Sequence, residues 1–163
     1  MVGIKKKLLS QIDLYSGQIS MPKGFEINRE TLQTDIIKQK IQDCQFPFSR
    51  EWDKLNTYLR EYIGLEYDFQ LVNKLTTGYM FKPNETSYPE KDINEVDLRN
   101  SPDYTMLYGV NLNNCLVKIY YDNNRRKGRS WDIKLGNNDF IIFPSTQQYF
   151  ITNNQKDNLN LIL

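Results

Sequence analysis

The stretch DYTMLYGVNLNNCLVKIYYDNN, residues 103–124, decides the fold class. It holds two runs rich in Tyr, Leu, Ile and Val, separated by Asn113-Asn114 and followed by Asn123-Asn124. Aromatic and β-branched residues favour strands, and asparagine tolerates the left-handed backbone that tight turns need. The stretch therefore predicts short strands at 103–112 and 115–122, each followed by a turn.

The same pattern continues in both directions. Toward the C-terminus, further strands are expected at 129–135, 139–143, 147–152 and 158–163. The last of these is apolar and must be paired, because an exposed apolar edge would be prone to aggregation. Toward the N-terminus, one strand is expected from alternation at Tyr67, Phe69, Leu71 and Asn73, and another at Met80 and Phe81.

The first part of the chain has a helical period. Leu32, Ile36, Ile37 and Ile41 predict a helix over 29–43. A second helix is expected to begin after Ser49 as its N-cap and to stop at Gly64, with Trp52, Leu55, Leu59, Tyr62 and Ile63 as its core stripe. Residues 1–28 and 83–102 are expected to be loops with little regular structure.

Helices followed by about eight short strands indicate an α+β, mostly β fold. The strands are expected to form a sandwich, a jelly roll or a barrel, with the N-terminal helices packed outside. We expect one domain over 1–163, made of a helical segment at 1–65 and a β core at 66–163.

Composition restricts the class of partner. The 163 residues carry a net charge of +1, so no global field favours nucleic acid, and nucleic-acid binding is unlikely on these grounds. No apolar run reaches the roughly 20 residues needed to span a bilayer, and no stretch resembles a signal peptide. Cys44 and Cys115 are expected to be reduced thiols. We expect a cytoplasmic or virion-associated protein with a protein partner.

The chain contains no histidine. This excludes a histidine-ligated metal centre and any Ser-His or Cys-His dyad. Two charged segments remain as candidate sites. The run Arg125, Arg126, Lys127 and Arg129 is expected at a hairpin tip, as a partner contact or a solvated loop. The acidic residues of the long loop (Glu85, Glu90, Asp92, Glu95, Asp97 and Asp103) match no known ion-binding spacing and are expected to be solvated.

Two stretches, GYMFKPNET at residues 78–86 and DFIIFPSTQQY at residues 139–149, together resemble iron(II)/2-oxoglutarate-dependent oxygenases of the prolyl-hydroxylase type. Residues 78–86, GYMFKPNET, are similar to the strand and turn that lead into the His-x-Asp motif of that family. Residues 139–149, DFIIFPSTQQY, are similar to the strand that ends in Phe-Pro-Ser before the distal histidine. The resemblance covers roughly residues 66–163 and implies a double-stranded β-helix, the jelly-roll or cupin-like fold.

The resemblance also implies that the metal ligands are lost. It places Asn84 and Thr86 at the His-x-Asp positions, Tyr149 at the distal histidine, and Lys156 near the arginine that clamps 2-oxoglutarate. Amide and hydroxyl groups are poor ligands for Fe(II), and lysine lacks the bidentate fork of arginine. We therefore interpret Asn84, Thr86, Tyr149 and Lys156 as a vestigial pocket with no catalytic or metal-binding residue.

Three functions remain open. The first is a non-catalytic oxygenase-fold protein in binding or assembly, which the resemblance would associate with marine tailed phages as a structural or accessory protein. The second is a divergent oxygenase with other ligands, which alone would require Fe(II) and 2-oxoglutarate. The third is a small-molecule binding β-barrel module. The absence of histidine favours the first, for which no cofactor is expected.

Overall fold

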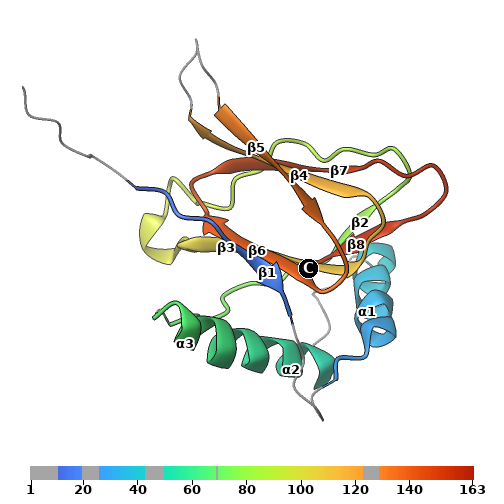
Figure 1. Ribbon diagram of the computed structural model, residues 1–163, viewed down its shortest axis with the longest axis horizontal. Helices are drawn as coiled ribbons and strands as arrows, with labels where there is room; N and C mark the ends of the chain where they lie inside the picture. Colours follow the sequence, from blue (N-terminus) through green and yellow to red (C-terminus); the bar gives the residue numbers. More distant parts are fainter. Residues whose placement is uncertain (1–10, 20–25, 43–49, 69, 123–128) are drawn as a thin grey trace, which may run out of the picture.

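The computed structural model describes residues 11–19, 26–42, 50–68, 70–122 and 129–163. Within them the chain forms three layers, with the helices below one antiparallel sheet and a second antiparallel sheet above it (Figure 1). The large sheet has the order β1 (Tyr15–Gln18), β6 (Asp139–Pro144), β3 (Tyr104–Asn111), β8 (Asn160–Ile162) and β2 (Tyr79–Phe81). The small sheet has the order β5 (Arg129–Leu135), β4 (Cys115–Asp122) and β7 (Gln148–Asn153). The prediction of an α+β, mostly β fold is confirmed, and the two sheets form a β-sandwich.

Strand β6 shows why the layers form. Its sequence DFIIFP is almost continuously apolar, as expected for a strand that is covered on both faces. Phe140 and Ile142 contribute to the core between the large sheet and the helices, whereas Ile141 and Phe143 contribute to the core between the two sheets. Because successive side chains point to opposite faces, one short strand supports both cores.

The helices supply the other half of the lower core. Helix α1 (Arg29–Gln42) buries Leu32 and Ile36, and α2 (Arg50–Tyr58) buries Trp52 and Leu55. The chain then continues through a π-helical turn at Leu59–Ile63 into α3 (Gly64–Glu66). The predicted stop at Gly64 is wrong. This glycine has helical angles, φ −59° and ψ −42°, because packing of the buried helix outweighs a propensity penalty of about 1 kcal/mol.

Most strand predictions are confirmed to within one or two residues, and those at 115–122 and 129–135 agree with β4 and β5 at both ends. The terminal strand is paired on both sides, by β3 and by β2. The strand predicted from Tyr67 to Asn73 is wrong. Asp68 has a φ of 52°, and Val72 is 86% exposed. Alternation alone therefore misled, because among the described residues this segment pairs with no strand of either sheet.

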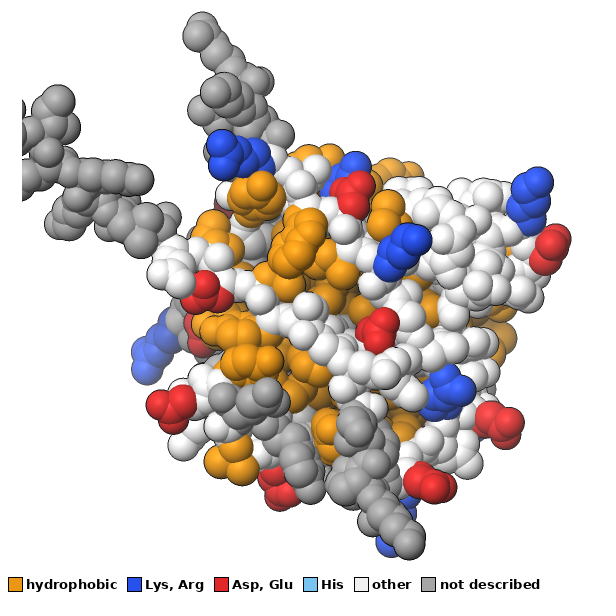
Figure 2. Space-filling model, viewed as in Figure 1, with side chains coloured by type: hydrophobic (Ala, Val, Ile, Leu, Met, Phe, Trp, Pro, Cys, Tyr) orange, Lys and Arg blue, Asp and Glu red, His pale blue; other side chains and the backbone are white. Residues whose placement is uncertain are grey.

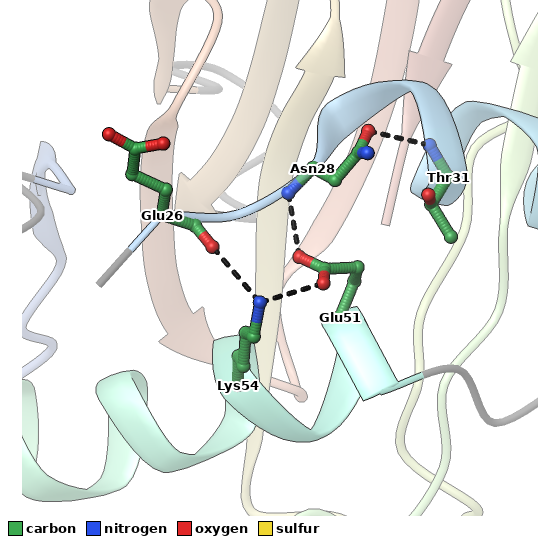
Figure 3. A network of polar contacts seen from close by, with 5 residues as sticks. All are labelled: Glu26, Asn28, Thr31, Glu51 and Lys54. Carbon is green, nitrogen blue, oxygen red and sulfur yellow. Dashed lines mark hydrogen bonds and ion pairs between the residues drawn. The ribbon is translucent and has the colours of Figure 1, made fainter. Parts of the chain in front are cut away.

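A polar network links the start of α1 to the first turn of α2 (Figure 3). Asn28 precedes α1, and its side-chain oxygen accepts a hydrogen bond from the Thr31 amide at 3.2 Å, as an N-cap does. The Asn28 amide in turn donates to the Glu51 carboxylate at 2.6 Å. Lys54 donates to Glu51 at 2.8 Å and to the Glu26 carbonyl at 3.3 Å. The start of α1 is thus tied to the first turn of α2. The predicted N-cap Ser49 lies outside the described residues.

Close backbone packing fixes the end of β3. A side chain at Gly109 would place its Cβ 2.0 Å from the Gly136 carbonyl oxygen, so only glycine fits there. The register between β3 and β8 shifts between Gly109 and Asn111, which marks a β-bulge. Asn114 and Asn138 have φ values of 55° and 63°. The turn predicted at Asn113-Asn114 is therefore confirmed, and Asn138 forms a second turn of the same kind before β6.

Candidate functional site

The long loop returns along β7 and delivers two carboxylates to the sandwich. The Glu90 amide donates to the Tyr149 carbonyl at 2.8 Å, and the Tyr149 amide donates back to the Glu90 carbonyl at 3.0 Å. The same alignment brings the Ser87 amide to the Ile151 carbonyl at 2.8 Å. The loop segment is thus held against β7 by backbone pairing, and Glu90 lies opposite Tyr149.

Six side chains meet here, and we call them the carboxylate–tyrosine cluster. They are Tyr79, Glu90, Asp92, Thr105, Ser145 and Tyr149. The Tyr79 hydroxyl donates to Glu90 Oε2 at 2.9 Å. The Tyr149 hydroxyl lies 3.1 Å from Asp92 Oδ2 and 3.4 Å from Glu90 Oε2. Since a phenol has one proton, the shorter contact is the hydrogen bond and the longer one is an alternative.

Asp92 is held by a second donor. The Thr105 hydroxyl donates to Asp92 Oδ2 at 2.5 Å, and its oxygen lies 3.2 Å from the Ser145 hydroxyl. Thr105 and Ser145 are buried, whereas Glu90 and Asp92 are half-buried. Each carboxylate therefore has at least one hydroxyl donor directed at it, which offsets part of the free energy of removing the charge from water.

The fold positions the cluster through β3, β6 and β7. Tyr149 is 1% exposed, and its ring meets that of Phe143 edge-on with centroids 5.2 Å apart. Thr105 lies opposite Phe143 in the register of β3 and β6, so both side chains face the space between the sheets. Asp92 follows Glu90 by two residues, the spacing that places both on one side of an extended segment.

Burial and the neighbouring carboxylates keep both phenols protonated. Burial is the main cause that raises the pKa of Tyr149, and the neighbouring Tyr79, Asp92 and Glu90 raise it further. Burial also raises the pKa of Tyr79, followed by the charge of Glu90 and the hydrogen bond to it. Protonated phenols donate hydrogen bonds to carboxylates but are weak metal ligands. In the cluster, hydroxyl groups therefore donate hydrogen bonds to the two carboxylates of Glu90 and Asp92.

A comparison with models of known protein families gives no match, and a comparison with curated proteins gives none. The geometry of the cluster therefore carries the functional argument. The described residues contain no helix that is long and apolar enough to cross a membrane.

The structure separates most residues of the predicted pocket from Tyr149. Asn84 is exposed, with a φ of 58°, and its amide donates to the Gln155 carbonyl at 3.0 Å. Thr86 is exposed and donates to the Thr152 hydroxyl at 3.2 Å. Lys156 is exposed in the turn between β7 and β8. Of the four predicted residues, only Tyr149 is in the core between the sheets.

The structure describes only the last residue of the basic run at 125–129. Arg125, Arg126 and Lys127 lie outside the described residues, so the prediction of a partner contact stays a prediction. Arg129 begins β5 and is exposed.

Sequence reasoning missed Glu90 and Asp92 as site residues, because the prediction of a solvated acidic loop included them. That prediction is wrong for these two, since both are half-buried and accept hydrogen bonds from hydroxyl groups. The available signal was their spacing. The sequence Glu90-Lys91-Asp92 alternates charge in a loop, and the two carboxylates share one side only if the segment is extended.

Proposed function

We propose that this protein is a non-catalytic jelly-roll protein, similar in fold to iron(II)/2-oxoglutarate-dependent oxygenases, that acts in binding or assembly. The observation that carries the proposal is the hydrogen bond from the Tyr149 hydroxyl to Asp92. This bond joins Tyr149, the residue that resembles the distal metal ligand, to Asp92. Asp92 lies two positions after Glu90, and Glu90 pairs with Tyr149.

The strand order supports the jelly roll. From β2 onward, the chain passes from the large sheet to the 84–93 segment beside β7, and then back to the large sheet at β3. It continues to β4 and β5 in the small sheet, to β6 in the large, to β7 in the small, and to β8 in the large. Counting the 84–93 segment as a strand, eight consecutive strands are divided between two antiparallel sheets. This division of the strands supports the proposal of a jelly roll.

The pairing of Glu90 with Tyr149 favours a different alignment from the one that the sequence suggests. Glu90-Lys91-Asp92 has the spacing of His-x-Asp and lies beside Tyr149, whereas Asn84 and Thr86 lie farther along β7 and are exposed. In this alignment Asp92 retains the family carboxylate, and Glu90 and Tyr149 replace the two histidines. The vestigial site is thus the carboxylate–tyrosine cluster.

This donor set does not fit the Fe(II) centre of the family. Fe(II) oxygenases use two imidazoles and one carboxylate, and here an acid and a protonated phenol take the imidazole positions. The hydroxyl groups of Tyr79, Tyr149 and Thr105 are already directed at the carboxylate oxygens. A role as a phage structural or accessory protein is the form of binding or assembly that the family resemblance implies.

The first experiment is a thermal-unfolding titration of metal-free protein with Mn(II), with and without 2-oxoglutarate. A ligand that binds the native state raises the unfolding midpoint as its concentration rises. We expect no saturable shift up to millimolar ligand. A shift that requires both Mn(II) and 2-oxoglutarate would overturn the non-catalytic proposal.

The second experiment tests the alignment. The double variant E90H/Y149H returns two imidazoles to the side of Asp92, and we expect it to gain a saturable Mn(II)- or Co(II)-dependent rise of the midpoint. The matched control is N84H/T86D/Y149H, which follows the sequence-based alignment and should gain none. If the control binds metal and E90H/Y149H folds but does not, the alignment through Glu90 and Asp92 is wrong.

A further inference from the structure

A pocket of about 280 Å³ opens where the edges of the two sheets approach each other. The segment before β1 forms one wall, and β4, β5 and β6 form the others. Its lining residues are Ile12, Asp13, Leu14, Ile119, Tyr121, Trp131, Phe143 and Gln147. Figure 2 shows hydrophobic side chains gathered on this face, between the positions of β5 and β1.

Three aromatic rings line this pocket. Trp131 lies opposite the buried Ile119 in the register of β4 and β5, so it points toward the space between the sheets. It is nevertheless 52% exposed, because β5 is the edge of the small sheet. Tyr121 is 45% exposed at the same end, and buried Phe143 forms the inner wall. The sandwich is therefore open here, with large aromatic faces accessible to a ligand.

The lining of the pocket also carries a negative charge. Among the described residues that line it, Asp13 is the only charged side chain, and Gln147 adds an amide. Behind Phe143 lies Tyr149, and behind that the carboxylates of Glu90 and Asp92. Aromatic faces attract cations through their negative π surface, and carboxylates add to that attraction. The pocket is therefore complementary to a cation that also carries apolar surface.

We propose that this pocket binds a small organic ammonium ion, with methyl or alkyl groups against Tyr121 and Trp131 and its charge near Asp13. The volume lies just below the roughly 300–1,000 Å³ of sites for drug-sized ligands, so the pocket has room for a small ammonium ion such as choline. This inference goes beyond the proposed function and does not rest on it, since the pocket and its charge are independent of the family alignment.

The probe is choline chloride, exchanged for sodium chloride at constant ionic strength. The chain has two tryptophans, the buried Trp52 and the exposed Trp131, so a nitrogen–proton correlation spectrum should show two indole signals. Trp131→Phe assigns them by removing one. We expect choline to shift the Trp131 signal saturably and to leave the Trp52 signal in place. No shift of the Trp131 signal up to about 50 mM choline, or equal shifts of both, would overturn the proposal.

Two comparisons separate a cation site from a merely apolar one. The neutral isostere 3,3-dimethyl-1-butanol has the shape of choline without its charge, and Asp13→Asn removes the carboxylate with little change in size. We expect each to weaken binding about two- to fivefold or more, the range expected for cation–π and charge terms at partly exposed sites. If the alcohol binds as tightly as choline and D13N has no effect, the site does not select cations.

Discussion

Replacing Tyr149 with Phe should destabilise the protein, because it removes one hydroxyl and almost no volume from the core. The hydroxyl lies 3.1 Å from Asp92 and 3.4 Å from Glu90. A hydrogen bond to a charged group contributes about 1.5–3 kcal/mol. Asp92 keeps the Thr105 hydroxyl and Glu90 keeps the Tyr79 hydroxyl, so neither carboxylate is left without a donor. We expect a loss of about 1–3 kcal/mol in the free energy of unfolding.

The assay is urea unfolding followed by the fluorescence of the buried Trp52 and by circular dichroism. The dependence on urea should keep its slope, since the surface exposed on unfolding is unchanged. Tyr120→Phe is the matched control, because Tyr120 lies on the neighbouring strand β4 and faces the other side of the small sheet. Its loss should stay within about 0.5 kcal/mol.

A double-mutant cycle of Y149F with Asp92→Ala then isolates the pair. If the hydrogen bond exists, the stability loss of the double variant should be smaller than the sum of the two single losses by about 1 kcal/mol or more. A Y149F variant as stable as the parent, or two strictly additive losses, would refute the reading of the cluster as a closed donor–acceptor network.

Three other perturbations test the fold around the site. Asn153→Ala should lower the free energy of unfolding by about 3–5 kcal/mol in urea titrations, because this fully buried amide is directed at the carbonyls of Phe81, Lys82 and Asn158. The hydrogen bond from Lys54, and next that from the Asn28 amide, lower the pKa of Glu51 below 4.5, so its stabilisation is present above about pH 4.5 and is lost as pH falls through the folded pKa. The loss caused by E51Q should therefore be larger at pH 6 than at pH 3. Burial raises the pKa of the Cys115 thiol from 9.0 to about 12. The contribution of this thiol to the free energy of unfolding is therefore complete below pH 9 and is lost as pH rises from 9 to about 12. The variant C115V should lose less stability than the parent over that interval.

The second half of the fold could be predicted because its turns are marked in the sequence. The left-handed Asn114 and Asn138 fix where strands end, and the continuous apolar run of β6 indicates a strand covered on both faces. The short strand β1 could not be found from residues 15–18 alone. It contains Gly17 and exposes most of its residues, and it forms only because the edge of β6 is available to pair with it.

The candidate site could be predicted only in part, because it depends on contacts between residues far apart in the chain. Tyr149 was identified through the Phe-Pro-Ser stretch that precedes it, and it is buried between the two sheets. The partner carboxylates could not be identified, because an irregular loop has no period that shows which residues turn inward. Glu90 faces Tyr149 through a register set by backbone hydrogen bonds between residues 59 positions apart.

The chemistry of the cluster explains how the β-sandwich accommodates two half-buried carboxylates beside a buried tyrosine. A half-buried carboxylate needs either a cation or hydrogen-bond donors, and without them it would be destabilising. In the proposed alignment the metal would have balanced Asp92, and here the Tyr149 and Thr105 hydroxyls supply the donors instead. A phenol is suited to that exchange, because it occupies a space comparable to that of an imidazole and its raised pKa keeps it protonated as a donor. The same hydrogen bond that stabilises Asp92 therefore directs its oxygen toward a proton rather than toward an open metal position.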